Sequence, residues 1–375
     1  MERTEGLVKG RSSNLELLRI ICMVLLIMHH LVVHGGSIGM EGMTANRIFS
    51  LIVLPAGKIC FNCFVAISTW FLVRSTFKAS RFVKVWLQVL FYNLVFLGAT
   101  FAIGGEYAAT LGWKNWLGAF FPMIGNSHGY AAAYLAFYLT IPFLRIVGDR
   151  IEKRQLTFLI VFLTVTQIMA GQLGFVTGYT QPFASEILLF VLCYFISLYL
   201  QKYPFQWQSN TAILLAIVLG IWLFTAFCRI FNGIYPANWF YMFFANIATG
   251  SEFSAFNILA GYALFLCFYK IKMPANKVIN TLATTTFGIL LMHDHNYFRP
   301  VVWHVIMKTE TWYYVPFVRF VCYMIVATLI IFVAGMLIDF VRQFCIEKYI
   351  LRTGMIKNLC GKLDGVFASL QNPKH

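Results

Sequence analysis

The first apolar stretch of the sequence carries the residues best suited to chemistry. Glu16 and Arg19 stand near its start, and His29, His30 and His34 follow. On a helix, the eleven residues from Arg19 to His30 come within about 20° of full turns and rise about 16 Å. Arg19, His30 and His34 therefore share one helix face, whereas His29 points about 100° away. A cation with an imidazole above it can hold an anionic group and transfer a proton.

A second set of ionisable side chains occurs later in the chain. The ninth apolar stretch ends in His293-Asp294-His295, and His128 opens the fourth. Counted along helices from one membrane face, His30 and His293 reach depths of about 22 Å and about 20 Å. Two imidazoles from different helices at one level suit acid–base catalysis inside a bilayer. Asp294 either orients an imidazole or marks the outer interface.

Each of these residues also has a purely structural interpretation. Arg19 can snorkel to lipid headgroups, and a buried His30 can serve as a helix-packing group. His29 is expected to be a packing or hydrogen-bonding neighbour. Lys58, midway through the second apolar stretch, fits a buried structural partner. Five acids fit solvated loops or the rim of the outer face: Glu41, Glu106, Glu186, Glu252 and Glu310.

Composition places these residues in a membrane protein. Of 375 residues, 60% are hydrophobic and 11% charged, and the mean hydropathy is +0.74. Soluble domains carry about 25% charged residues, so a cytoplasmic enzyme and a disordered chain are excluded. The apolar runs are continuous and lack the alternation of a β-barrel. Nine cysteines lie mostly in these runs, which excludes a disulfide-stapled domain. The single Cys60-Phe-Asn-Cys63 has no second pair, and no metal is expected.

The apolar stretches predict an all-α bundle of about ten transmembrane helices. Of the 29 Lys and Arg residues, 22 fall on one side when the N-terminus is cytoplasmic, as the positive-inside rule requires. Both termini are therefore predicted to be cytoplasmic, and the net charge of +15 is attributed to topology instead of nucleic-acid binding. We expect a membrane domain over 1–345 and a cytoplasmic tail over 346–375. The predicted helices are 15–35, 47–73, 82–103, 128–147, 156–176, 183–201, 211–231, 253–270, 281–300 and 315–340.

This topology divides the polar groups between the two faces. The inner mouth is basic, with Arg19, Arg74, Arg81 and Lys84, and arginine binds the phosphates of a ligand such as coenzyme A bidentately. The outer half is rich in histidine, acids and aromatic residues, which suit a neutral polyhydroxyl such as a sugar. An imidazole between the two can activate a hydroxyl for acyl transfer.

Several motifs resemble those of the acyltransferase-3 family of bacterial integral-membrane O-acyltransferases. Arg11-Ser-Ser-Asn-Leu-Glu16-Leu-Leu-Arg19 with His30 eleven residues on is similar to the family's first-helix signature. Arg81-Phe-Val-Lys84 falls where the family often has Arg-x-x-Arg. Further segments follow in the family's order: Phe64-Val-Ala-Ile-Ser-Thr-Trp-Phe-Leu72, Tyr134-Leu-Ala-Phe-Tyr-Leu-Thr-Ile-Pro142 and Thr286-Phe-Gly-Ile-Leu-Leu-Met-His293. Thr69 stands in a glycine position and Leu290 in a tyrosine position of the family's motifs.

The resemblance implies a multi-pass protein of the plasma membrane that takes an acetyl group from cytoplasmic acetyl-CoA. The acceptor would be a hydroxyl of an envelope, capsular or exopolysaccharide glycan, or of a lipid-linked oligosaccharide. It implies that His30 is the acid/base residue, with Glu16 and Arg19 essential around it. The matching depth of His293 adds this residue as a second catalytic partner. The resemblance also assigns Arg81 and Lys84 to donor binding. Arg19 and Arg74 are added to the donor site by their place in the basic inner mouth, and His34, His128 and Asp294 are assigned to the acceptor by their place in the outer half. Lys84 lacks the planar fork of arginine. The alternative is a secondary transporter or flippase for a lipid-linked sugar or organic anion, in which the histidines and acids relay protons.

Overall fold

The computed structural model describes residues 12–109, 111–123, 128–177 and 186–371, which form helices and connecting turns without strands. Six helices are long and apolar enough to cross a membrane, and the all-α, multi-pass class is therefore confirmed. The number of ten spans and the cytoplasmic termini stay predictions. The six are α1 (Ser13–His34), α2 (Ala45–Leu72), α3 (Ala79–Ile103), α6 (Gly129–Arg150), α9 (Thr211–Ile234) and the continuous segment Phe317–Ile350 that contains α14 (Phe317–Arg342).

Other predicted spans correspond to elements of varied length. These are α7 (Lys153–Thr177), α8 (Glu186–Lys202), α11 (Ala255–Tyr269), α12 (Lys277–Ala283) and α13 (Thr286–His293). Shorter elements complete the chain: η1 (Ser37–Gly39), α4 (Gly105–Ala109), α5 (Trp113–Phe120), η2 (Gln206–Ser209), α10 (Trp239–Met242), η3 (Phe243–Ala248), η4 (Val301–Ile306), η5 (Thr309–Trp312), η6 (Gln343–Glu347), α15 (Lys348–Ile350) and α16 (Gly354–Gln371).

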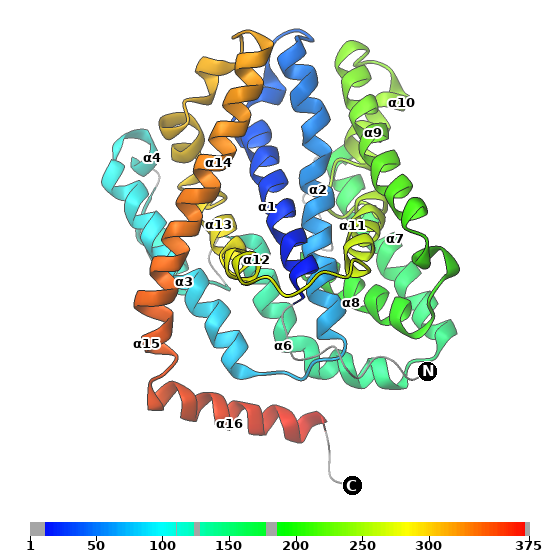
Figure 1. The fold of residues 1–375 in the computed structure, drawn as a ribbon, viewed down its shortest axis with the longest axis vertical. Helices are drawn as coiled ribbons and strands as arrows, with labels where there is room; N and C mark the ends of the chain where they lie inside the picture. The colour runs from blue at the N-terminus through cyan, green and yellow to red at the C-terminus, as the bar shows by residue number, and fades with distance from the viewer. Residues whose placement is uncertain (1–11, 110, 124–127, 178–185, 372–375) are drawn as a thin grey trace.

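The helix α1 lies in the middle of the bundle, between α2 and α14 (Figure 1). It also contacts α11, α12 and α13. Two apolar clusters meet along it: Leu18 and Cys22 belong to one, and Ile27 and Leu31 to the other. Because neighbouring helices enclose α1 on several sides, its histidine face looks into protein. We name the face where α1 begins the lower face and the opposite one the upper face (Figure 1).

The C-terminal helix α16 crosses the lower face beneath α3 and α6 (Figure 1). The carboxylate of Asp364 accepts a hydrogen bond of 2.6 Å from the backbone N–H of Ala79, the first residue of α3. The rings of Phe77 and Phe367 pack with their centroids 4.1 Å apart. A free N–H of the first turn of α3 is thereby satisfied, and α16 is attached to the bundle.

The helix predicted over 253–270 agrees closely with α11, and the helix predicted over 281–300 differs most from the structure. The helix α11 begins at Ala255, directly after the non-helical stretch 249–254. The helix predicted over 281–300 is divided into α12 and α13 and ends at His293. The cause is the run of Thr284, Thr285 and Thr286, whose hydroxyls donate to backbone carbonyls three residues earlier and so compete with helical hydrogen bonding. Irregular backbone at membrane depth is tolerated where it is buried or lines a cavity.

Candidate active site

The centre of the site is a pair of imidazoles contributed by α1 and α13. Nδ1 of His30 lies 2.9 Å from Nε2 of His293, and Nδ1 of His293 lies 2.6 Å from the backbone carbonyl oxygen of Ile289. His293 is fully buried and His30 is 8% exposed. The two rings therefore meet at one level of the bundle, as their counted depths predict, and neither faces the surrounding lipid.

These contacts fix which ring nitrogens carry protons. A carbonyl oxygen only accepts, so Nδ1 of His293 donates to Ile289. Nε2 of a neutral His293 then holds a lone pair, and Nδ1 of His30 must donate to it. His30 is left with a lone pair on Nε2. The chain carbonyl–imidazole–imidazole thus selects the tautomer of His30 that can take a proton from a substrate.

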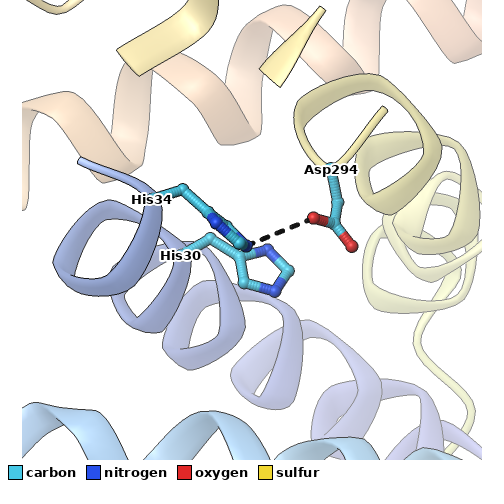
Figure 2. A group of neighbouring side chains, drawn as sticks. All are labelled: His30, His34 and Asp294. Atoms are coloured by element: carbon cyan, nitrogen blue, oxygen red, sulfur yellow. Dashed lines mark ion pairs between the residues drawn. The ribbon is translucent and has the colours of Figure 1, made fainter. Parts of the chain in front are cut away.

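A cluster of three polar side chains, His34, Asp294 and Arg299, lies next to the His30–His293 pair and nearer the upper face. Nη1 of Arg299 lies 3.2 Å from Oδ1 of Asp294 and 3.3 Å from Nε2 of His34, and His34 lies 3.6 Å from the same carboxylate oxygen. Figure 2 shows His30 and His34 projecting from α1 toward Asp294. The side chains of His34, Asp294 and Arg299 are 25%, 31% and 29% exposed. This group is thus accessible from outside the packed core.

Two residues of this cluster, His34 and Asp294, have the spacing of a metal site together with His30. Ligand atoms of His30, His34 and Asp294 lie within 4.8 Å of one another. The guanidinium of Arg299 nevertheless contacts both His34 and Asp294, and its positive charge opposes a second cation there. These residues fit an internal ion pair beside the imidazoles better than a metal centre.

His29 takes the packing position expected for it. Its Nδ1 lies 2.6 Å from the backbone carbonyl oxygen of Leu54, so it donates to α2. Its ring rests against Gly57, where a Cβ atom would overlap the imidazole. The absence of a side chain at Gly57 therefore sets how closely α1 and α2 approach at the level of His30.

We expect Gly57→Ala to destabilise the protein. The added methyl group has to push α1 and α2 apart, and overpacking of this kind costs about 1–3 kcal/mol. The measurement is the thermal unfolding temperature of the purified protein in detergent. Gly220→Ala is the control, because a Cβ atom at that position of α9 meets nothing within 4 Å. Equal unfolding temperatures for the two variants would contradict this role of Gly57.

A second imidazole pair is formed by His128 and His295. Their ring centroids are 5.0 Å apart, and Nδ1 of His295 accepts a 3.3 Å hydrogen bond from the N–H of Phe298. Both residues are buried, and neither Nε2 atom has a partner among the described residues. His128 therefore reaches the imidazole region, although it contacts His295 and not the His30 ring.

The predicted donor-binding residues are only partly brought together. Arg19 pairs with Glu16 at 3.1 Å, and Arg81 donates to the hydroxyl of Ser75, the residue after Arg74, at 3.4 Å. Arg74 instead donates to Gln201 at 2.7 Å, and Lys84 pairs with Glu347 at 2.7 Å. The structure thus places Arg81 against the segment that carries Arg74, while Arg19 engages its own helix and Lys84 the end of another.

A buried charge network holds α13 in place. Asp339 of α14 is fully buried and accepts hydrogen bonds from Gln88, Tyr92, Arg342 and Gln343. Gly288 of α13 lies directly against it, where a Cβ atom would overlap the Asp339 carboxylate. Because Gly288 precedes His293 on the same short helix, this contact fixes the position from which His293 reaches His30.

Several members of this site have a weak signature in the sequence or none. His295 was visible in the motif His293-Asp294-His295 but had no assigned role. Arg299 gives only the signal of a charge at the end of a predicted membrane segment. The backbone carbonyl of Ile289, which sets the tautomer of the pair, has no side-chain signature at all.

Comparison with known proteins gives one finding. A family model described as an acyltransferase domain, of the acyltransferase-3 type, matches residues 12–336. No curated protein and no solved structure matches the chain. The matched region includes both imidazole pairs, the ion pairs around them and the first-helix motif that contains Glu16 and Arg19. The chain belongs to the acyltransferase-3 family of membrane acyltransferases.

Proposed function

We propose that the protein is a plasma-membrane O-acetyltransferase. It moves an acetyl group from acetyl-CoA at the lower, cytoplasmic face to a hydroxyl of an envelope, capsular or exopolysaccharide glycan, or of its lipid-linked precursor. The observation that carries the proposal is the buried His30–His293 pair, whose contacts leave a lone pair on Nε2 of His30. The concentration of Lys and Arg on one predicted side supports the orientation.

In the proposed reaction, Nε2 of His30 takes the proton of the acceptor hydroxyl. The hydroxyl oxygen forms a bond to the thioester carbonyl carbon, and the carbon–sulfur bond breaks. The coenzyme A thiolate that leaves then takes the proton from His30, so that no charge accumulates in the bundle. His293 acts through His30 as a positioning residue, because it holds the ring and its tautomer.

The donor is proposed to approach from the lower face along α1. Arg19 is held by Glu16, and with Arg81 it supplies cations for the phosphates of coenzyme A. The rise of about 16 Å from Arg19 to His30 matches a pantetheine arm of about 15–20 Å. Glu16 is therefore assigned to orienting Arg19. His34, Asp294 and His128 face the acceptor side in this proposal.

Loss of the donor-binding arginines is expected to raise the requirement for acetyl-CoA. A hydrogen bond between charged groups contributes about 1.5–3 kcal/mol, so Arg19→Gln and Arg81→Gln should each increase KM for acetyl-CoA about tenfold or more. Steady-state rates at fixed acceptor measure this effect. Arg145→Gln removes an exposed arginine that pairs with Asp149 at 4.0 Å and serves as the control. An unchanged KM in both test variants would refute the donor-site assignment.

The direct test of the function is NMR of the envelope glycan from cells with and without the gene. We expect the O-acetyl methyl signal to disappear in the deletion strain and to return with the wild-type gene. The transporter alternative is favoured by one observation, the interruption of the membrane segments before α11 and after α13, since transporters place ligands at such breaks. Unchanged acetylation together with sugar accumulating on one leaflet would favour that alternative.

A further inference from the structure

An ion pair that the proposed reaction does not use lies inside the bundle. Nζ of Lys58, halfway along α2, is 2.7 Å from Oε2 of Glu252. Glu252 belongs to the non-helical stretch between η3 and α11. Although Lys58 lies within a membrane-spanning helix, the two side chains are 33% and 25% exposed. An ionic group at this depth is costly and marks a functional position by default.

The loop that carries Glu252 is held rigidly. Nδ2 of Asn62 donates to the carbonyl oxygen of Glu252 at 2.9 Å, and Nδ2 of Asn257 donates to the carbonyl oxygens of Thr249 and Ser251 at 2.9 and 2.8 Å. Both asparagines are almost completely buried. Side chains from α2 and α11 thus satisfy the irregular backbone. The result is a preorganised loop that fixes the Glu252 carboxylate beside Lys58.

This ion pair faces the same region as the His30 site. Lys58 directly follows Gly57, against which the ring of His29 packs. The rings of His29 and His30 have their centroids 5.5 Å apart, so Lys58 lies on α2 at the level of these two histidines. The Lys58–Glu252 pair therefore lies on the His29 side of His30, and the Asp294–Arg299 pair lies on its His34 side, where Arg299 contacts His34 and the rings of His30 and His34 are 5.1 Å apart. Each pair combines one cation with one anion, and the two pairs add no net charge to the surroundings of these histidines.

We propose that Lys58 and Glu252 bind the acceptor and determine its class, a neutral sugar. This inference rests on the function proposed above. Neighbouring hydroxyls of a sugar donate to the Glu252 carboxylate and accept from the Lys58 ammonium. A sugar held in this way presents a further hydroxyl to Nε2 of His30. A uronic acid would compete with Glu252 for Lys58 and place two carboxylates together, so acidic sugars bind more weakly.

The test uses the full-length protein in detergent, with acetyl-CoA as donor and unacetylated glycan extracted from gene-deletion cells as acceptor. Glu252→Gln keeps the shape of the side chain and removes its charge. We expect the glycan concentration for half-maximal transfer to rise about tenfold, as for a lost charge-assisted hydrogen bond, with KM for acetyl-CoA unchanged. Lys58→Met should show the same rise in the half-maximal glycan concentration, also with KM for acetyl-CoA unchanged. Asp149→Asn, in an exposed pair on α6, is the matched control.

A second measurement needs no variant. Methyl glucoside and methyl glucuronide are compared as inhibitors of transfer by the wild-type protein, and the neutral glycoside should inhibit more strongly. The proposal would be overturned if Glu252→Gln left the glycan concentration for half-maximal transfer unchanged, or if it raised this concentration and KM for acetyl-CoA equally. Stronger inhibition by the glucuronide than by the glucoside would also overturn it. If the wild-type protein transfers no acetyl group to the extracted glycan, the proposed function itself fails, and the two failures are thus distinguished.

Discussion

His30→Gln is expected to abolish acetyl transfer while leaving the protein folded and inserted in the membrane. The substitution removes the imidazole whose Nε2 holds the free lone pair. A positioned general base contributes about 10²–10⁴-fold to a rate, so we expect a loss of about 10³-fold. The measurement is the initial rate of acetyl transfer from acetyl-CoA to glycan extracted from deletion cells.

Two neighbouring variants show whether the loss belongs to His30 itself. His29→Gln is the matched control on the same helix turn, because a glutamine amide can still donate to the carbonyl of Leu54. We expect its rate to stay within a few-fold of the wild type. His293→Phe retains a ring but cannot accept from Nδ1 of His30, and its rate should fall less than that of His30→Gln, with KM for acetyl-CoA unchanged. Full activity in His30→Gln would remove His30 from the mechanism.

Much of the arrangement along α1 follows from helix geometry. The spacing of Arg19, His30 and His34 predicts a shared face, and counted depths place His30 beside His293. Their 2.9 Å contact agrees with that expectation. This succeeds because a membrane helix of known length has few positions available to it, so residue number converts directly into depth.

Other contacts depend on backbone irregularity, for which apolar periodicity gives no signal. Three consecutive threonines interrupt the segment predicted as one helix over 281–300. The sequence predicts that Glu252 is a solvated residue of a loop or rim. The break before α11 nevertheless brings it to Lys58, 194 residues away in sequence. Lys84, which the family resemblance assigns to the donor, pairs with Glu347 near the end of α14. Partners this far apart are set by tertiary packing, to which a single sequence gives no direct access.

Asp339→Ala is expected to destabilise the protein strongly. Oδ1 of Asp339 lies 2.7 Å from Nε of Arg342, and both side chains are buried. Removal of the carboxylate leaves Arg342 with only Glu347 as an ionic partner among the described residues. It also deprives Tyr92 and Gln88 of this acceptor, whereas Gln343 keeps its bonds to Thr284. Breaking a buried ion pair costs about 3–5 kcal/mol. Unfolding of the purified protein by denaturant in detergent measures the loss.

Two further variants test whether the loss of stability comes from an uncompensated buried charge or from lost packing. Asp149→Asn removes one partner of an exposed pair and should cost about 0–1 kcal/mol. Asp339→Met combined with Arg342→Met removes both buried charges, and it should be more stable than Asp339→Ala, because no uncompensated charge remains. If the double variant is less stable than the single one, the charge argument is wrong. Because Gly288 rests on Asp339, we also expect Asp339→Ala to slow acetyl transfer in the fraction that stays folded, since α13 then holds His293 less firmly against His30.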